Sequence, residues 1–285
     1  MTDSADLKAS TATTWDANPA GWSHAPGEEV GSRAFFETAY RARREEEIPF
    51  LDELLPWDDF AGKRVLEIGC GAGFDAFTLC EHGAVYTGID YAPNNPARAR
   101  AHLAHFGHAP PVMRSDGERL PFTDASFDVC FSNGVLHHTP NMRAAFREAG
   151  RVLTPGGSFW VVLYHKHSAY HWLSIFLFEW IIKGGFLKRS LAHQRSRIEV
   201  TGAAEDVLVD VYSRGEMQRI LCDAGFEVRS VWVRKLPGRD LPAYRVLKHF
   251  YRFVPRVLAR WCECRWGWYI TAHAVKRSAG QCDEA

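Results

Sequence analysis

The sequence lacks long apolar runs, net charge and a regular cysteine spacing. No run reaches the roughly 18 apolar residues of a membrane span, and no basic segment precedes an apolar one near the start, so neither a span nor a signal peptide is expected. The 34 Lys and Arg residues balance 34 Asp and Glu residues, which removes a global argument for a nucleic-acid or acidic partner. Seven cysteines, an odd number, indicate reduced thiols and a cytoplasmic protein.

The remaining composition is that of an ordinary globular chain. Its 46% hydrophobic content excludes disorder, collagen and coiled coil, and its 285 residues allow one or two domains. Residues 1–18 are small and polar, and we expect them to be frayed unless something covers them. Ser32 is a candidate cap for a helix that presents Phe35 and Phe36 on one side and stops near Pro49.

From Arg64 onward, short apolar runs alternate with helical stretches, which predicts an α/β fold with a mostly parallel sheet. The predicted strands are Arg64–Ile68, Val85–Asp90, Pro111–Arg114, Phe127–Ser132, Gly157–Leu163, Phe226–Val233 and Trp268–Val275. The predicted helices are Phe74–His82, Pro96–Phe106, Met142–Val152 and Ser213–Ala224. We therefore expect an N-terminal lid with helices over 1–60, then one domain over 61–285 with insertions at about 164–212 and 234–267 that form a cap over the acceptor.

The strongest local signal is a strand that runs into three glycines and then directly into a helix. Gly69, Gly71 and Gly73 permit a tight turn, and the following helix presents free N–H groups to a nucleotide-like ligand. Phe74 stands where the dinucleotide fingerprint has its last glycine, which weakens the case for NAD. Asp90 ends the next strand, where a carboxylate can accept hydrogen bonds from a ribose. Taken without the evidence of the glycine turn, Asp90 could equally be a solvated acid at the end of a strand.

Several blocks in this region resemble the class I S-adenosylmethionine-dependent methyltransferases. The acid-x-Gly-x-Gly-x-Gly motif is matched from Glu67, and Asp116 in RSDGERLPF matches the acid after the third strand. LPFTDASFDVCFSNGVLHHTPN and FREAGRVLTPGGSFWVV resemble the small-molecule subgroup that includes the ubiquinone and menaquinone methyltransferases. The resemblance covers about residues 64–163. It implies a Rossmann-like, seven-stranded sheet whose last strand is antiparallel, with helices on both faces.

The resemblance also implies S-adenosylmethionine as cofactor and methyl transfer to O, N or C of a small, hydrophobic or aromatic molecule. The positions that it assigns to the cofactor, together with their neighbours at the same strand ends, are Glu67, Gly69, Gly71, Gly73, Asp90, Tyr91, Asp116, Gly117, Asn133 and His138. Catalysis in such enzymes is chiefly positioning, with a base needed only if the acceptor must lose a proton.

Three residues at the predicted carboxyl edge are candidates for catalysis: His138, Tyr164 and His165. An imidazole that titrates near neutrality can take a proton from a hydroxyl or an amine. The alternatives are packing of the cofactor pocket for His138 and loop packing for the other two. His165 and His167 alternate as metal ligands do, but two ligands are too few, so no metal is expected.

Candidates for binding the acceptor are spread over the chain: Trp15, Trp22, Arg33, Tyr164 and Trp172. We interpret TWDANPAGW as a short lid element, because tryptophans are unusual in an N-terminal segment of otherwise small and polar residues. Its Asn18-Pro19 differs from the Asn-Pro-Pro-aromatic motif of nucleic-acid methyltransferases, which directly follows strand 4, so no nucleic-acid substrate is expected. Arg33 reads equally well as a solvated arginine.

The two insertions differ in character. His171–Leu187 is apolar and aromatic on all sides, which indicates burial as a cap or insertion at a membrane surface. Between Arg229 and Arg265 ten Lys or Arg residues face only two acids, and Pro255 should split the amphipathic pattern there. This basic insertion fits either peripheral contact with an anionic membrane or packing on Glu45–Glu47.

Two alternatives to a methyltransferase stay open at this point. The same fold can use S-adenosylmethionine for transfers other than methylation, and a cofactor-binding protein can dock a membrane or partner through its basic and aromatic insertions. The sequence leaves the oligomeric state open.

Overall fold

The computed structural model describes residues 4–187, 190–196, 207–236 and 254–278. Within them one sheet has seven strands in the order β3-β2-β1-β4-β5-β7-β6. The strands are β1 (Arg64–Ile68), β2 (Val85–Asp90), β3 (Val112–Arg114), β4 (Phe127–Asn133), β5 (Leu153–Tyr164), β6 (Phe226–Arg234) and β7 (Tyr269–Lys276). Strands β1 to β5 are parallel, and β7 runs antiparallel to both β5 and β6, so the predicted Rossmann-like sheet is confirmed.

The fifth strand begins four residues earlier than predicted. It contains the Pro-Gly-Gly turn, where Gly156 takes a left-handed backbone with φ of 76°. The pairing with β4 shifts at this point, from Phe127 opposite Leu153 to Val129 opposite Ser158. Glycine allows the extra residues to leave the ladder without ending the strand.

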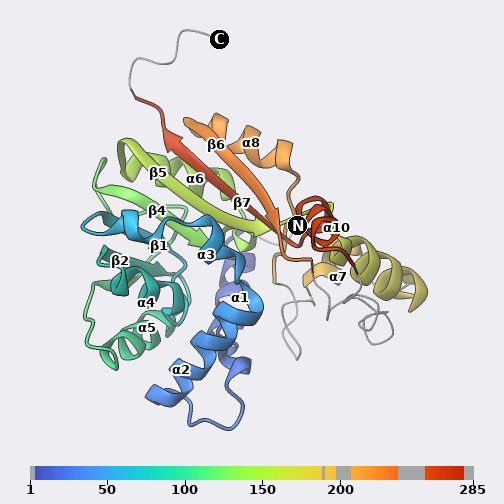
Figure 1. Cartoon of the computed structure of the whole chain (residues 1–285), viewed down its shortest axis with the longest axis horizontal. Coiled ribbons are helices and arrows are strands. Elements are labelled where there is room, and N and C mark those ends of the chain that lie inside the picture. The colour runs from blue at the N-terminus through green and yellow to red at the C-terminus, as the bar shows by residue number, and fades with distance from the viewer. Residues whose placement is uncertain (1–3, 188–189, 197–206, 237–253, 279–285) are drawn as a thin grey trace.

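Apolar side chains fill both faces of the sheet, which explains why its central strands read as continuous hydrophobic runs. Helices α4 (Phe74–Glu81) and α5 (Asn95–Ala104) cover one face, with Leu79 and Leu103 in its core. Helices α6 (Met142–Val152) and α8 (Arg214–Asp223) cover the other, as Figure 1 shows.

The N-terminal segment joins the first of these cores. Its elements are α1 (Ser4–Ala17), η1 (Trp22–His24), α2 (Arg33–Ala42), the π-helical turn η2 (Arg43–Glu47), α3 (Phe50–Leu54) and η3 (Trp57–Phe60). Ser32 caps α2 as predicted, its Oγ accepting a hydrogen bond from the Phe35 N–H at 3.1 Å. Phe50, Leu51 and Phe60 are buried against the sheet.

Residues 4–17 form helix α1, so the condition under which the N-terminus was expected to be ordered, contact with another part of the chain, is met. The helix has almost no amphipathic character, so its sequence pattern could not reveal it. Long-range polar contacts hold it: the Lys8 ammonium lies 2.7 Å from Asp116, and Asp16 accepts hydrogen bonds from the backbone and side-chain N–H groups of Asn94.

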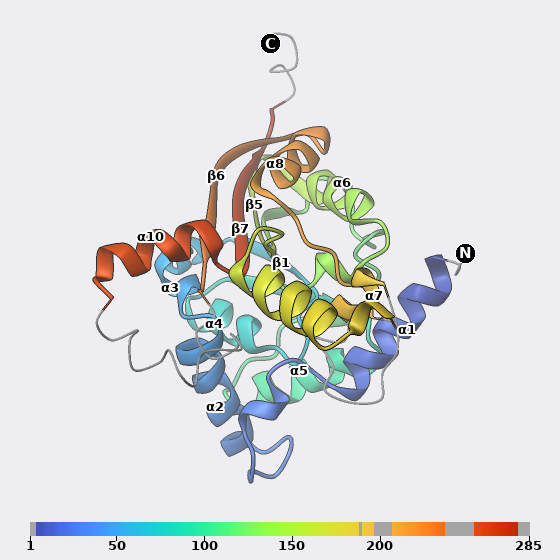
Figure 2. The ribbon, with the colours of Figure 1, turned by 90° about the vertical axis from the view of Figure 1, so that its right-hand side faces the viewer.

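The insertions form helices beside the carboxyl edge of the sheet, on the side that faces the viewer in Figure 2. They are the π-helix η5 (Tyr170–Ile182), η6 (Gly185–Leu187), α7 (Leu191–Ser196) and α10 (Arg256–Trp266). Helix α10 starts directly after Pro255, and the basic residues Arg245, Lys248 and Arg252 lie outside the described residues. In the parts of the chain that the structure describes, no helix combines the length and apolar character needed to cross a membrane.

Candidate functional site

A cavity of about 590 Å³ opens at the carboxyl ends of β1, β2 and β4. This volume is typical of a pocket for a small ligand, and the carboxyl edge is where open α/β sheets bind ligands. One wall is the sheet edge and the other is the N-terminal segment, which contributes Lys8, Trp15 and Trp22. The lid expected from the N-terminal tryptophans therefore has a helix as its main part.

The first two glycines after β1 have different tasks. Gly69 has φ of 83°, and a Cβ there would overlap the side chain of Val135, so it serves close packing. Gly71 has φ of 52° and lines the cavity, and a Cβ there would meet no atom within 4 Å. The open side of the turn at Gly71 is thus free for a ligand to approach the backbone.

The third glycine, Gly73, lies away from the cavity wall. It precedes helix α4 with φ of 82°, and a Cβ there would lie 3.1 Å from the Ala99 backbone. Gly73 lets α4 and α5 approach each other, so its place in the motif reflects helix packing.

Asp90 is fixed at the end of β2 by three hydrogen bonds. The Gly71 N–H donates to one carboxylate oxygen at 2.8 Å, and the other oxygen accepts from the Ala92 N–H at 2.8 Å and from Asn95 at 3.2 Å. Burial nevertheless raises the pKa of the Asp90 carboxyl above its ordinary value. The carboxylate is thus tied to the glycine turn and held rigidly at the cavity, with lone pairs left for a ligand.

A second carboxylate, Glu67, lies deep in the cavity. The Tyr86 hydroxyl donates to it at 2.6 Å, and burial raises the Glu67 pKa well above its ordinary range. Both groups lie beneath the glycine turn.

Next to Glu67, sequence reasoning missed a buried charge cluster. The Arg43 guanidinium lies 3.1 Å from Glu47 and 3.6 Å from Asp75, and Asp75 accepts a hydrogen bond from the Asn133 side chain at 2.8 Å. Arg43 lines the cavity, and its buried Nε has no hydrogen-bond partner among the described residues. The run RREEE gave no sign of this, because a charge run normally lies in solvent.

The loop after β3 brings Asp116 and Gly117 to the opposite end of the cavity. Lys8 of α1 lies 2.7 Å from Asp116 and 2.8 Å from Glu118, so this end of the site is closed by an ion pair with the lid. Gly117 is needed for packing, since a Cβ there would lie 2.9 Å from Ile68. The Lys8 ammonium also lies 5.7 Å from the ring centroid of Tyr91, which lines the cavity beside it.

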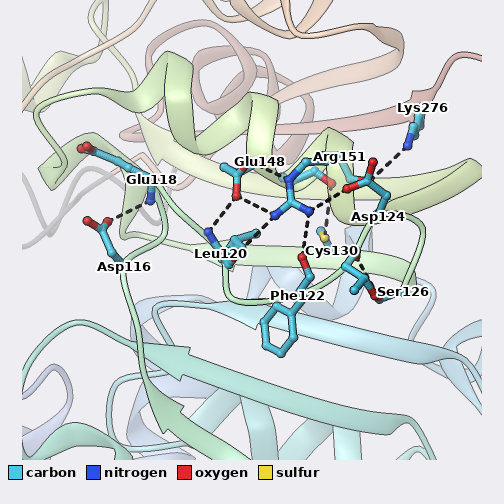
Figure 3. A network of polar contacts seen from close by, with 12 residues as sticks. Asp116, Glu118, Leu120, Phe122, Asp124, Ser126, Cys130, Glu148, Arg151 and Lys276 are labelled. Carbon is cyan, nitrogen blue, oxygen red and sulfur yellow. Dashed lines mark hydrogen bonds and ion pairs between the residues drawn. The ribbon is translucent and has the colours of Figure 1, made fainter.

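Arg151 holds this loop in place, as Figure 3 shows. Its guanidinium donates to the carbonyls of Leu120 and Phe122 at 3.1 and 2.7 Å and to Glu148 at 2.8 Å. Glu148 in turn accepts the Leu120 N–H at 2.8 Å. Because these bonds fix the chain just after Glu118, helix α6 determines where Asp116 lies.

His138 is at the rim after β4, in the turn η4 (Leu136–His138). Its Nδ1 lies 2.6 Å from the Leu208 carbonyl oxygen, which can only accept, so Nδ1 carries the proton and Nε2 carries a lone pair. Nε2 is buried and has no partner among the described residues, although His138 lines the cavity. Burial lowers the His138 pKa to about 4, so the ring stays neutral near pH 7.

Aromatic rings surround His138. The Trp15 ring lies 5.1 Å from His138, and Tyr164 lies 6.2 Å from it, edge to face. The cavity is also lined by Trp22, Phe74, Tyr91 and Tyr269. This part of the cavity thus offers mainly apolar surface, with the buried Nε2 of His138 among the rings.

Besides Gly73, three expected site residues do not line the cavity. His165 is buried with its Nδ1 3.1 Å from the Gly267 carbonyl oxygen, and burial lowers its pKa to about 4. Arg33 pairs with Glu37 at 2.8 Å, and Trp172 is 44% exposed on η5. Among the described residues the insertions contribute only Tyr164 to the wall, and the N-terminal segment lines the cavity as well.

The cavity is acidic. Five of its lining side chains carry carboxyl groups and two are fixed cations. They are Glu47, Glu67, Asp75, Asp90 and Asp116 against Lys8 and Arg43. Burial raises the pKa of Glu67 and of Asp90, so a cation bound beside them favours their charged forms. Such a lining favours a ligand with positive charge and disfavours the pyrophosphate of a dinucleotide. The described residues contain no group of three or more His, Cys, Asp or Glu side chains placed to hold a metal ion.

Comparisons with known proteins agree with this geometry. The model of a family described as methyltransferase domain matches residues 66–161. A phthiotriol/phenolphthiotriol dimycocerosates methyltransferase of Mycobacterium tuberculosis is 41% identical over 106 residues, which is 35% of this chain and 37% of that protein. A ubiquinone biosynthesis O-methyltransferase of Idiomarina loihiensis is 29% identical over 160 residues, 54% of this chain and 66% of the relative.

Among solved structures, an S-adenosylmethionine-dependent methyltransferase from Mesorhizobium loti superposes with a TM-score of 0.54 at 20% identity, covering 81% of this chain and 97% of the other. The expected resemblance to this class is confirmed in sequence and in fold. The match spans less than two thirds of the length of either curated relative, so the comparison reaches only part of each protein.

Proposed function

We propose, from the class I methyltransferase domain that residues 66–161 form, that this protein transfers a methyl group from S-adenosylmethionine to a small hydrophobic acceptor. The observation that carries the proposal is the acid-lined cavity at the glycine turn, with Asp90 tied to Gly71 at its centre. S-adenosylmethionine bears a sulfonium and an ammonium against one carboxylate, so its net positive charge suits this lining.

The residues present fit this cofactor along its whole length. The free backbone side of Gly71 and the two held oxygens of Asp90 suit the ribose and its linkage, and Asp116 suits the adenine amino group. At the other end, Glu67 suits the ammonium, and the unpartnered Nε of Arg43 suits the carboxylate. When bound, S-adenosylmethionine supplies an already activated methyl group, so the protein must mainly position the acceptor.

His138 is proposed to position the acceptor. Its Nε2 is a buried hydrogen-bond acceptor without a partner, so it can receive an O–H or N–H of the acceptor and orient the adjacent lone pair. Its low pKa makes it a weak base, so we assign it orientation and, at most, late acceptance of the proton. His165, Arg33 and Trp172, which lie outside the cavity wall, remain predictions without support from its lining.

The acceptor is proposed to be hydrophobic and aromatic or lipid-like. Support comes from the rings of Trp15, Trp22, Tyr164 and Tyr269 along the cavity, and from relatives whose names refer to phthiotriol dimycocerosates and to ubiquinone biosynthesis. Such molecules partition into membranes, so peripheral membrane contact belongs to the same proposal. The cytoplasmic setting inferred from the cysteines stays a prediction.

The proposal is tested by incubating the full chain with methyl-labelled S-adenosylmethionine and a cell extract divided into lipid, small polar and macromolecular pools. We expect label in the lipid pool together with stoichiometric S-adenosylhomocysteine. Label in the macromolecular pool would overturn the acceptor class. Turnover of the cofactor without S-adenosylhomocysteine would instead support a transfer other than methylation.

A further inference from the structure

Helix η5 exposes apolar side chains along most of its length. Only His171, Ser174 and Ile175 are buried in it. Large apolar residues exposed on η5 and in the turn that follows are Trp172, Leu173, Leu177, Ile181, Ile182, Phe186 and Leu187. Ile182 is 64% exposed, which is far from the burial or the substrate-covering role that an apolar helix suggests.

Helix α10 shows the same property at the other insertion. It has no buried residue, and Val257, at 83%, is the most exposed of its apolar side chains Val257, Leu258, Trp261 and Trp266. Polar contacts hold the helix to the protein: Arg260 lies 2.7 Å from Glu53, and Glu263 accepts the Lys235 N–H at 2.9 Å. The acidic partner of α10 is thus Glu53 of α3.

The start of η5 lies close to the end of α10, beside the cavity. The Tyr170 ring at the start of η5 lies 5.0 Å from Trp268, which follows α10. Trp268 stacks on Tyr164 at 4.3 Å, and Tyr164 lines the cavity. Both helices lie on the face turned toward the viewer in Figure 2.

The charge of this region indicates what covers it. Helix α10 carries Arg256, Arg260 and Arg265 against Glu263, and the sequence from Arg229 to Arg265 holds ten bases and two acids. Tryptophan, aliphatic residues and arginine on one helix are typical of segments that lie at a lipid headgroup boundary. A second copy of the chain would bring an equally basic surface against this one, which like-charge repulsion opposes.

We propose that the exposed faces of η5 and α10, with Phe186 and Leu187, form a membrane-docking surface that rests on an anionic lipid bilayer. Apolar side chains enter the headgroup boundary, and Arg256 and Arg265 meet anionic lipid. Docking does not depend on catalysis. The role that we give to docking rests on the proposed function, because docking brings a lipid-dissolved acceptor to the side of the molecule where Tyr164 lines the cavity.

The test is sedimentation of the full chain with vesicles of phosphatidylcholine alone or mixed with phosphatidylglycerol. Two double variants remove the surface, L177S/I181S on η5 and L258S/W261S on α10. The matched control is V30S/V85S, which removes two apolar residues that are each 58% exposed elsewhere on the surface. We expect binding to mixed vesicles that weakens with salt and falls about tenfold or more in each surface variant, and unchanged binding in the control.

Equal sedimentation of all variants, or no binding by the unaltered chain, would overturn the proposal. So would a lipid-free dimer, seen by analytical ultracentrifugation, that the same surface variants dissociate. Calorimetric binding of S-adenosylmethionine and methyl transfer to a detergent-dispersed acceptor are expected to be unchanged in the variants. Failure of the proposed function would appear instead as absent methyl transfer by a chain that still binds vesicles.

Discussion

The two sides of the cavity are built in different ways. On the cofactor side, Gly71 and Asp90 lie at the ends of β1 and β2, and the hydrogen bond between them joins these neighbouring parallel strands. On the other side, formed by helix α1 and the acceptor region, groups are joined across large sequence distances: Lys8 of α1 reaches Asp116, 108 residues away, and His138 is oriented by Leu208, 70 residues away. A local sequence motif encodes the first arrangement. The second depends on contacts between distant segments, which form only when the chain folds.

This difference suggests how each side tolerates change. A strand-end residue is fixed by the sheet, so its substitution removes the contacts of its own side chain and leaves the strands paired. A residue on the acceptor side depends on a partner that is itself held by surface contacts, so its substitution loosens a segment. The predictions below separate the two cases.

The largest effect is expected from Asp90→Ala. Removing a carboxylate that accepts two ligand hydroxyls costs about 3–6 kcal/mol, so affinity for S-adenosylmethionine should fall at least 100-fold in calorimetry. Asp223→Ala, which removes an exposed carboxylate on α8 paired with Arg143, is the control and should bind normally. Unchanged affinity in Asp90→Ala would show that the cofactor side does not lie at the glycine turn.

A smaller effect is expected from His138→Leu. Loss of one hydrogen bond to the acceptor should lower kcat/KM about 10- to 100-fold, and S-adenosylmethionine affinity should change little. His138→Gln, which keeps an accepting atom, should recover part of the loss. Equal activity of the Leu and Gln variants would mean that His138 only packs the pocket.

The sequence predicts the groups that lie at strand ends, and particular residues show why. The turn at Gly71 and the acid at Asp90 depend on strand ends and backbone freedom, both of which leave a local pattern. Arg43 and Lys8 were missed because their roles depend on Asp75 and Asp116 in distant segments. Gly73 was included among the ligand residues because the motif does not distinguish a glycine that packs helices from one that lines a cavity.

Lys8→Met should have a local effect. Its ion pairs with Asp116 and Glu118 are partly buried, so their loss should destabilise α1 by about 1 kcal/mol. Amide exchange within residues 5–17 should then speed about fivefold, while strands β1 to β4 exchange as before. Lys8→Arg should restore slow exchange, and faster exchange throughout the sheet would contradict the separation of the two sides.

The smallest effect is expected from pH. Since burial lowers the His138 pKa to about 4, the ring is neutral throughout the range from about pH 6 to pH 8. The ratio of kcat/KM between the unaltered chain and His138→Gln should therefore stay constant over this range. A ratio that rises through about pH 6.5 would reveal a histidine that titrates normally and acts as a base.

The central claim is that an acid-lined cavity at a glycine turn selects a cationic cofactor. Calorimetric titration of the full, unaltered chain with S-adenosylmethionine and, separately, with NAD tests it most directly. The structure predicts saturable binding of S-adenosylmethionine at one site per chain and no saturable binding of NAD. Binding of NAD with comparable affinity would contradict the claim.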